Sequence, residues 1–83
     1  MTKNIVITGC STGIGLETAK YLKERFITVY PTARDPKDVE MLISLGFDNT
    51  MVLDVTKPES IASVIDRVLE IEGHIDVWFN NAG

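Results

Sequence analysis

Three glycines lie close together near the start of the chain, in the stretch TGCSTGIG. Gly9, Gly13 and Gly15 follow directly after the apolar run NIVI, at spacings of four and two residues. Glycines between a buried strand and a helix let an anion approach the first backbone amides of the helix, where the helix dipole favours negative charge. The pattern therefore predicts a site for a diphosphate group, with hydroxyl donors from Ser11 and Thr12.

The spacing gives each glycine a distinct expected role. Gly9 would make the turn out of the strand, Gly13 would let the anion approach the backbone, and Gly15 would let the helix pack closely on the strand. The alternative is a plain strand-to-helix turn that merely tolerates glycine. We favour the diphosphate site, because a strand before the stretch and a helix after it are the context that a dinucleotide-binding fingerprint requires.

The elements that must position this stretch alternate between strands and helices. Short apolar runs predict strands at residues 4–8, 27–32, 51–55 and 75–80, and amphipathic patterns predict a helix after each of the first three. The order βαβαβαβ implies a parallel sheet with right-handed crossovers and strand order 3-2-1-4. We therefore predict an α/β, Rossmann-like, three-layer fold in which residues 1–83 form a single partial domain. Ligands of such sheets bind outside the carboxyl ends of strands one and four.

Local signals predict how the helices begin and which faces they bury. Asp35 and Pro36 are expected to start the second helix, and Thr56 and Glu59 of TKPE to form a capping box before the third. Pro31 cannot donate a ladder hydrogen bond, so we expect a bulge or an early end in strand two. The apolar residues expected to face the sheet are Ile14, Ala19, Leu22 and Phe26, then Val39, Leu42 and Ile43, and finally Ile61, Ile65, Val68 and Leu69.

Composition narrows the class of protein. The 83 residues are 45% hydrophobic and 24% charged, with a formal net charge of -4, which is typical of one small packed domain. The negative charge argues against a nucleic-acid surface, and no apolar run approaches the roughly 18 residues that span a bilayer. The single cysteine cannot form an internal disulfide, and the start shows no export signal. We therefore expect a cytoplasmic protein with small-molecule partners and neither nucleic acid nor membrane among them.

Three motifs together resemble one known family. TGCSTGIG, LDV and NNAG, in that order and at those separations, are similar to the short-chain dehydrogenase/reductase family. The resemblance covers the whole chain, yet it corresponds only to the first third or so of a member. It implies an NAD(P)-binding domain of an oxidoreductase that transfers hydride between a nicotinamide cofactor and a carbonyl or alcohol group. The cofactor-binding residues that it implies are Gly9, Ser11, Thr12, Gly13, Ile14, Gly15, Asp54, Val55, Asn81, Ala82 and Gly83.

The same resemblance implies a role for each of the later motifs. The carboxylate of Asp54 would bind the adenine amino group, the backbone of Val55 would hold the ring, and residues 81–83 would pass under the adenosine ribose. The hydroxyl of Thr8 would tie strand one to that last segment. Alternatively, Asp54 only caps the turn into the third helix, and the asparagines at positions 80 and 81 are ordinary turn formers.

The end of the second strand predicts which nicotinamide cofactor is bound. A carboxylate there holds the free ribose hydroxyls of NAD(H), whereas the 2'-phosphate of NADP(H) needs a cation. The acidic residue of the family pattern would occupy the position of Ala33, and Arg34 is placed to bind a phosphate. NADP(H) is therefore favoured over NAD(H), with Arg34 as a further cofactor-binding residue. The alternative is that Arg34 is a solvated residue near Asp35 or Asp38.

The catalytic residues of the family have no counterpart in this sequence. Members use a Tyr-x-x-x-Lys pair and a serine, whereas Tyr21 and Tyr30 are followed four residues later by Arg25 and Arg34. We assign no catalytic residue and no metal ligand, and we do not expect the chain to turn over substrate alone. We expect Tyr21 to be a partly buried packing residue. An unpaired strand edge and an exposed sheet face would allow self-association.

Two questions stay open from the sequence. Cys10, at a helix start, could be a reactive thiol, although a small residue filling a loop position is favoured. For the function, the leading hypothesis is the cofactor-binding part of an NADP(H)-dependent short-chain oxidoreductase. The alternatives are a non-catalytic nucleotide-binding or interaction module, a degenerate remnant, and another Rossmann-like enzyme such as a methyltransferase.

Overall fold

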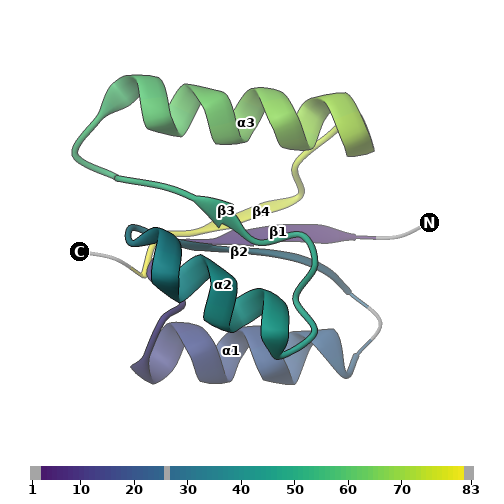
Figure 1. The fold of residues 1–83 in the computed structure, drawn as a ribbon. Helices are drawn as coiled ribbons and strands as arrows, with labels where there is room; N and C mark the ends of the chain where they lie inside the picture. Colours follow the sequence, from purple (N-terminus) through teal and green to yellow (C-terminus); the bar gives the residue numbers. More distant parts are fainter. Residues whose placement is uncertain (1–2, 26, 82–83) are drawn as a thin grey trace.

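The computed structural model describes residues 3–25 and 27–81, and it has the predicted alternation of strands and helices. The four strands are parallel and lie in the order β3-β2-β1-β4, which confirms the predicted topology. Helices α1 and α2 cover one face of the sheet and α3 covers the other, so the fold has three layers (Figure 1). The elements are β1 (Asn4–Ile7), α1 (Gly13–Lys23), β2 (Thr28–Ala33), α2 (Pro36–Ser44), β3 (Met51–Val52), α3 (Pro58–Glu72) and β4 (Val77–Phe79).

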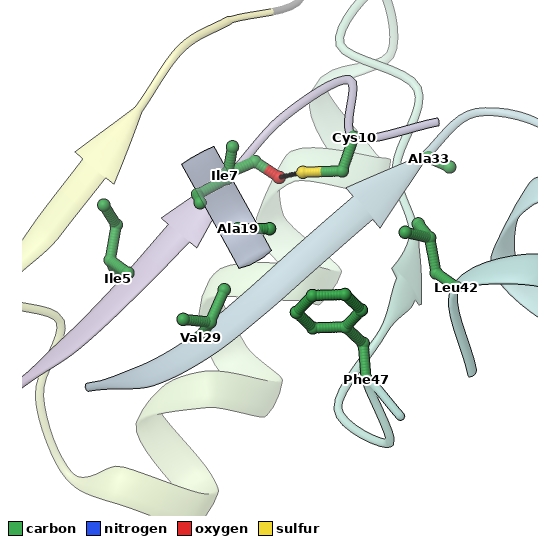
Figure 2. Close-up of a cluster of buried hydrophobic side chains, with 8 residues drawn as sticks. All are labelled: Ile5, Ile7, Cys10, Ala19, Val29, Ala33, Leu42 and Phe47. Atoms are coloured by element: carbon green, nitrogen blue, oxygen red, sulfur yellow. Dashed lines mark hydrogen bonds between the residues drawn. The ribbon is translucent and has the colours of Figure 1, made fainter. Parts of the chain in front are cut away.

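The core consists of two clusters, one on each face of the sheet. Strand β1 contributes to both, because Ile5 and Ile7 point to one face and Val6 to the other, as expected for a strand covered on both sides. The cluster under α1 and α2 is shown in Figure 2. It contains Ile5, Ile7, Cys10, Ala19, Val29, Ala33, Leu42 and Phe47. The cluster under α3 contains Val6, Tyr30, Leu53, Val64 and Val68.

Strand β2 continues through Pro31, so the predicted bulge or early strand end is wrong. Pro31 is buried and pairs with Ile7 of β1 in unbroken register. The carbonyl of Ala33 points toward β3, because it accepts from the backbone N–H of Leu53. Every second residue of a strand directs its backbone groups to the same side, so the nitrogen of Pro31 also faces β3. In the part of the chain that the structure describes, β3 pairs only with Thr32 and Ala33. Pro31 therefore interrupts no ladder hydrogen bond.

Several residues predicted to lie on the buried helix faces are exposed in the structure, whereas the predicted cap of α2 is present. Ile14, Ile43 and Leu69 are 71%, 43% and 42% exposed, so these three do not face the sheet. The buried residues of α3 are Val64 and Val68, and Phe26 lies outside the described residues. The carboxylate of Asp35 accepts from the backbone N–H of Lys37 at 2.9 Å, which confirms the cap of α2.

The predicted capping box before α3 is wrong. The N-cap residue of α3 is Lys57, without a side-chain cap hydrogen bond, and Pro58 follows in the first turn. The hydroxyl of Thr56 donates instead to Asp54, at 2.6 Å. The backbone N–H of Thr56, which would donate to the Glu59 carboxylate in a capping box, donates to Asp54 Oδ1 as well, at 2.9 Å. The aspartate two residues earlier is the nearer acceptor, so the local turn forms in preference.

A polar junction joins the amino ends of β1 and β4. The buried side chain of Asn4 donates to the carbonyl of His74 at 3.0 Å and accepts from the backbone N–H of Asp76 at 3.1 Å. The backbone N–H of Asn4 donates to the Asp76 carboxylate at 2.8 Å, and His74 Nε2 lies 3.0 Å from the same oxygen. These bonds fix the start of β4 beside the start of β1.

This junction predicts a dependence of stability on pH. The hydrogen bond from the Asn4 backbone is the main cause that holds the pKa of Asp76 below its ordinary value of 3.8. A depressed carboxyl pKa stabilises the fold above the unfolded value, and this contribution is lost as the pH falls through the lower folded value. We expect the free energy of unfolding to fall below about pH 4, and Asp76→Asn to reduce that slope. Urea denaturation between pH 2 and 7 measures the free energy of unfolding, with Asp66→Asn on the exposed face of α3 as the control variant. Equal pH slopes in the unchanged protein, Asp76→Asn and Asp66→Asn would contradict the prediction.

Candidate functional site

The glycine stretch forms a tight junction between β1 and α1. Gly9 and Gly13 have φ values of 65° and 64°, in the left-handed region that favours glycine. At Gly15 the constraint is space, because an added Cβ would lie 2.5 Å from the carbonyl oxygen of Gly9 and 2.6 Å from Asn81 Nδ2. An added Cβ at Gly13 would meet nothing within 4 Å. The loop is thus closely packed beside Gly15 and open beside Gly13.

The amino end of α1 is exposed and carries no side-chain cap. Its N-cap residue, Thr12, makes no side-chain cap hydrogen bond, and the first turn contains no acidic residue. Thr12, Gly13 and Ile14 are exposed, and Ser11 is half-buried. The first amides of a helix need acceptors from outside it. Because α1 begins at the edge where the carboxyl ends of the strands meet, these amides are available to an anion bound there (Figure 1).

The segment after β4 is bonded to the glycine stretch. Asn81 Nδ2 donates to the carbonyl of Gly9 at 3.1 Å, and the backbone N–H of Thr8 donates to the carbonyl of Phe79 at 3.1 Å. The hydroxyl of Thr8 donates to Asn80 Oδ1 at 3.2 Å, so Thr8 does tie β1 to this segment. The asparagines therefore hold specific partners rather than serving only as turn formers. Ala82 and Gly83, two of the implied site residues, lie outside the described residues.

A second polar group stands beside the glycine stretch, where β2 and β3 end. Arg34 Nε lies 3.6 Å from Asp54 Oδ2, with 79% of the Arg34 side chain and 17% of the Asp54 side chain exposed. Arg34 is thus largely solvated, as in the alternative interpretation, and its acidic partner is Asp54 rather than Asp35 or Asp38. Val55, which follows Asp54, is 38% exposed at the same edge.

Asp54 is held by the turn that leads into α3. Its Oδ1 accepts from both the backbone N–H and the hydroxyl of Thr56, at 2.9 and 2.6 Å, and its backbone N–H donates to Ser60 Oγ at 3.0 Å. The hydroxyl of Thr56 is the largest cause that lowers the pKa of Asp54, so the carboxylate stays charged at neutral pH. Sequence reasoning missed Thr56 and Ser60 as its partners, although the spacing Asp-x-Thr is a known turn signal.

The other residues considered for chemistry are placed away from this edge or are buried. Tyr30 is buried and donates to Glu72 at the end of α3, at 2.6 Å, rather than facing Arg34. Tyr21 is 56% exposed, with Arg25 over its ring, so the expectation of a partly buried packing residue is wrong. In residues 3–25 and 27–81, no group of three or more acidic, histidine or cysteine side chains could hold a metal ion. No helix of that part is long and apolar enough to cross a membrane.

Cys10 lies in the packed core and not at an open helix start, which favours the packing role over a reactive thiol. It is fully buried, its thiol donates to the carbonyl of Ile7 at 3.3 Å (Figure 2), and burial raises its pKa to about 11. Because thiolate is the reactive form, we expect iodoacetamide at pH 7.5 to leave Cys10 unmodified in the native protein and to modify it rapidly in urea. Mass spectrometry of the quenched reaction measures this. Native labelling at the rate seen in urea would contradict the packing role.

Comparisons with known proteins show which family the sequence and the fold resemble. A family model described as short chain dehydrogenase matches residues 3–83. The chain is 42% identical over 84 residues to the uncharacterized oxidoreductase YbbO of Escherichia coli K12. The aligned region covers 100% of this chain and 31% of that protein. A crystal structure of a short-chain dehydrogenase from Streptomyces avermitilis matches with a TM-score of 0.86 at 35% identity, over 100% of this chain and 31% of that one. An actinorhodin polyketide ketoreductase crystallised with NADPH matches with a TM-score of 0.89 at 28% identity, over 99% of this chain and 33% of that one. The chain thus spans about a third of the length of these relatives.

Proposed function

The chain belongs to the short-chain dehydrogenase/reductase family, and on that premise we propose that it is the cofactor-binding part of an NADP(H)-dependent oxidoreductase. Residues 1–83 form a single, partial Rossmann-like domain in this proposal. Hydride transfer between the cofactor and a carbonyl or alcohol group belongs to the intact protein. The family binds nicotinamide dinucleotides, and the group that such a cofactor supplies is a transferable hydride.

The observation that carries the proposal is the start of α1, which has no side-chain cap and follows a glycine loop that packs closely against the helix at Gly15. Gly15 allows α1 to approach the carbonyl of Gly9, and Gly13 leaves open space beside the first amides of the helix. A diphosphate placed there meets unsatisfied N–H groups and the positive end of the helix dipole. The proposed cofactor-binding residues are Gly9, Ser11, Thr12, Gly13, Ile14, Gly15, Arg34, Asp54, Val55, Asn81, Ala82 and Gly83.

The preference for NADP(H) rests on the residues that follow β2. Ala33 is buried and Arg34 is exposed, so a cation rather than an acid stands where the adenosine ribose would lie. The nearest acid in sequence, Asp35, is occupied in capping α2. A guanidinium with free terminal nitrogens suits the 2'-phosphate of NADP(H).

Two further expectations belong to this proposal. The edge strand β4 carries Val77, which is 47% exposed, and such an edge would support self-association of the chain. Sedimentation velocity at several protein concentrations tests it, and a monomer at all of them would reject it.

A cytoplasmic location is proposed because the one cysteine, Cys10, is a buried free thiol.

Calorimetric titration of the purified protein with NADPH, NADH and S-adenosylmethionine tests the proposed function. We expect NADPH to bind most tightly, because only it carries the 2'-phosphate that Arg34 would meet. Equal affinity for NADPH and NADH would reject the cofactor preference alone. Binding of S-adenosylmethionine in their place would reject a nicotinamide cofactor, and binding of no nucleotide would reject a cofactor site in this chain.

A further inference from the structure

We propose that Thr56 is a positioning residue for cofactor discrimination, which acts on Arg34 through the carboxylate of Asp54. The inference rests on the proposed NADP(H) site, and it concerns a residue that would touch no part of the cofactor's 2'-phosphate itself. Thr56 lies in the loop between β3 and α3, two residues after Asp54. Its two donors and the ion pair beyond them form one chain of contacts.

The first contact fixes the orientation of a carboxylate. Both donors of Thr56, the backbone N–H at 2.9 Å and the hydroxyl at 2.6 Å, bond to the same oxygen, Oδ1 of Asp54. The main chain of Asp54 is held as well, because its N–H donates to Ser60 Oγ and its carbonyl accepts from the N–H of Lys57, each at 3.0 Å. With Oδ1 occupied and the backbone fixed, the carboxylate presents Oδ2 in one direction.

The second contact passes that orientation to a flexible cation. Asp54 Oδ2 lies 3.6 Å from Arg34 Nε, and the Arg34 side chain is otherwise largely exposed. The register of β2 and β3 pairs Ala33 with Val52, which brings the residues just beyond each strand end side by side. Attraction through Nε leaves the two terminal nitrogens of Arg34 for a phosphate, whose oxygens they can bind in parallel. An arginine restrained in this way loses less side-chain entropy when the phosphate binds.

The size of the effect follows from the exposure of the ion pair. Exposed pairs are worth little in water, so the restraint on Arg34 corresponds to a change of about two- to fivefold in affinity. The measured quantity is the ratio of NADPH affinity to NADH affinity. Any contact between Asp54 and the adenine ring is common to both cofactors and cancels in this ratio, so the ratio isolates the effect on Arg34.

The experiment compares Thr56→Val with Thr56→Ser and Thr50→Val. Thr56→Val removes the hydroxyl donor but keeps the backbone N–H, whereas Thr56→Ser keeps both. Thr50 serves as the matched control, because its hydroxyl makes a similar local bond to the carbonyl of Phe47, at 2.7 Å, before β3. We expect the NADPH to NADH ratio to fall about two- to fivefold in Thr56→Val and to stay at the wild-type value in the other two.

A second readout follows the carboxylate directly. Since the Thr56 hydroxyl is the main cause of the low pKa of Asp54, NMR titration should find that pKa higher in Thr56→Val and restored in Thr56→Ser. If Thr56→Val does not fold, Thr56→Ala replaces it, because it also removes the hydroxyl donor while the backbone N–H and the charge of Asp54 are kept. The same fall in the ratio is then expected.

The outcomes separate this inference from the proposed function. Equal binding of NADPH and NADH by the unchanged protein rejects the NADP(H) proposal. A clear preference that Arg34→Ala abolishes, but that Thr56→Val (or Thr56→Ala in its place) leaves unchanged, rejects the positioning role alone. An equal fall in Thr56→Val and Thr50→Val also rejects it, because the effect would then come from general loosening of the β3 region.

Discussion

Gly15→Ala is expected to weaken NADPH binding at least tenfold and to lower the free energy of unfolding by about 1–3 kcal/mol. The methyl group would lie 2.5 Å from the carbonyl oxygen of Gly9 and 2.6 Å from Asn81 Nδ2. These two groups are bonded to each other at 3.1 Å, so a shift of either one alone breaks the link between β1 and the segment after β4. Relief of the clash must shift the glycine loop away from α1. Urea denaturation and calorimetric titration with NADPH measure the two effects.

Gly73→Ala is the matched control for this substitution. Gly73 ends α3 with φ of 82°, and an added Cβ there would meet nothing within 4 Å. Alanine at that position carries the left-handed backbone penalty of roughly 1–2 kcal/mol without any clash. We therefore expect Gly73→Ala to lower stability and to leave NADPH affinity unchanged. Equal loss of affinity in both variants would mean that general instability, not the geometry of the loop, causes the effect of Gly15→Ala.

The topology could be predicted from the sequence because local signals and the global fold agree. Apolar runs without alternation indicate strands covered on both faces, and glycine, proline and aspartate punctuate them. The Asp35 cap and the strand order were predictable for this reason. The role of Gly9 in turning the chain also follows from its place after a buried strand, and in the structure its backbone is left-handed.

The errors share a physical cause, which is competition between neighbours that sequence spacing does not reveal. Pro31 is tolerated because β3 is short and pairs with Thr32 and Ala33, so the side of β2 that the Pro31 nitrogen faces needs no donor there. The position of β3 cannot be read from the residues around Pro31. The hydroxyl of Thr56 prefers the carboxylate of Asp54 to a capping box, because a charged acceptor lies within reach. Helical periodicity likewise placed Ile14 on the buried face, although it lies in the first turn at the open edge and is 71% exposed.

The site shows the same division between what is local and what is not. The glycine stretch is a continuous segment, so its geometry could be anticipated from spacing alone. The pairing of Arg34 with Asp54 joins the ends of two different strands, and no pattern within either segment indicates it. Such contacts depend on the register of β2 and β3, which only the folded sheet determines.

Arg34→Ala is expected to reduce NADPH affinity roughly 10- to 100-fold and to change NADH affinity less than about twofold. The difference arises because a guanidinium can make charge-assisted, bidentate hydrogen bonds to a 2'-phosphate that NADH does not carry. The exposed position of Arg34 makes this an effect on binding rather than on folding. Titrations of both cofactors with the unchanged and the substituted protein measure it.

Arg25→Ala separates a local contact from the general field of the protein. Arg25 lies beyond the end of α1, where its guanidinium donates to the Tyr21 hydroxyl at 3.0 Å, at the opposite end of that helix from the glycine loop. Its removal lowers the positive charge of the chain by the same amount, so a loss of NADPH affinity as large as that of Arg34→Ala would indicate nonspecific attraction.

A direct phosphate contact also predicts that the advantage of NADPH over NADH weakens as salt is added to the unchanged protein, and that this dependence disappears in Arg34→Ala. An unchanged preference for NADPH in Arg34→Ala would place the 2'-phosphate elsewhere and remove the basis for assigning NADP(H) to this chain.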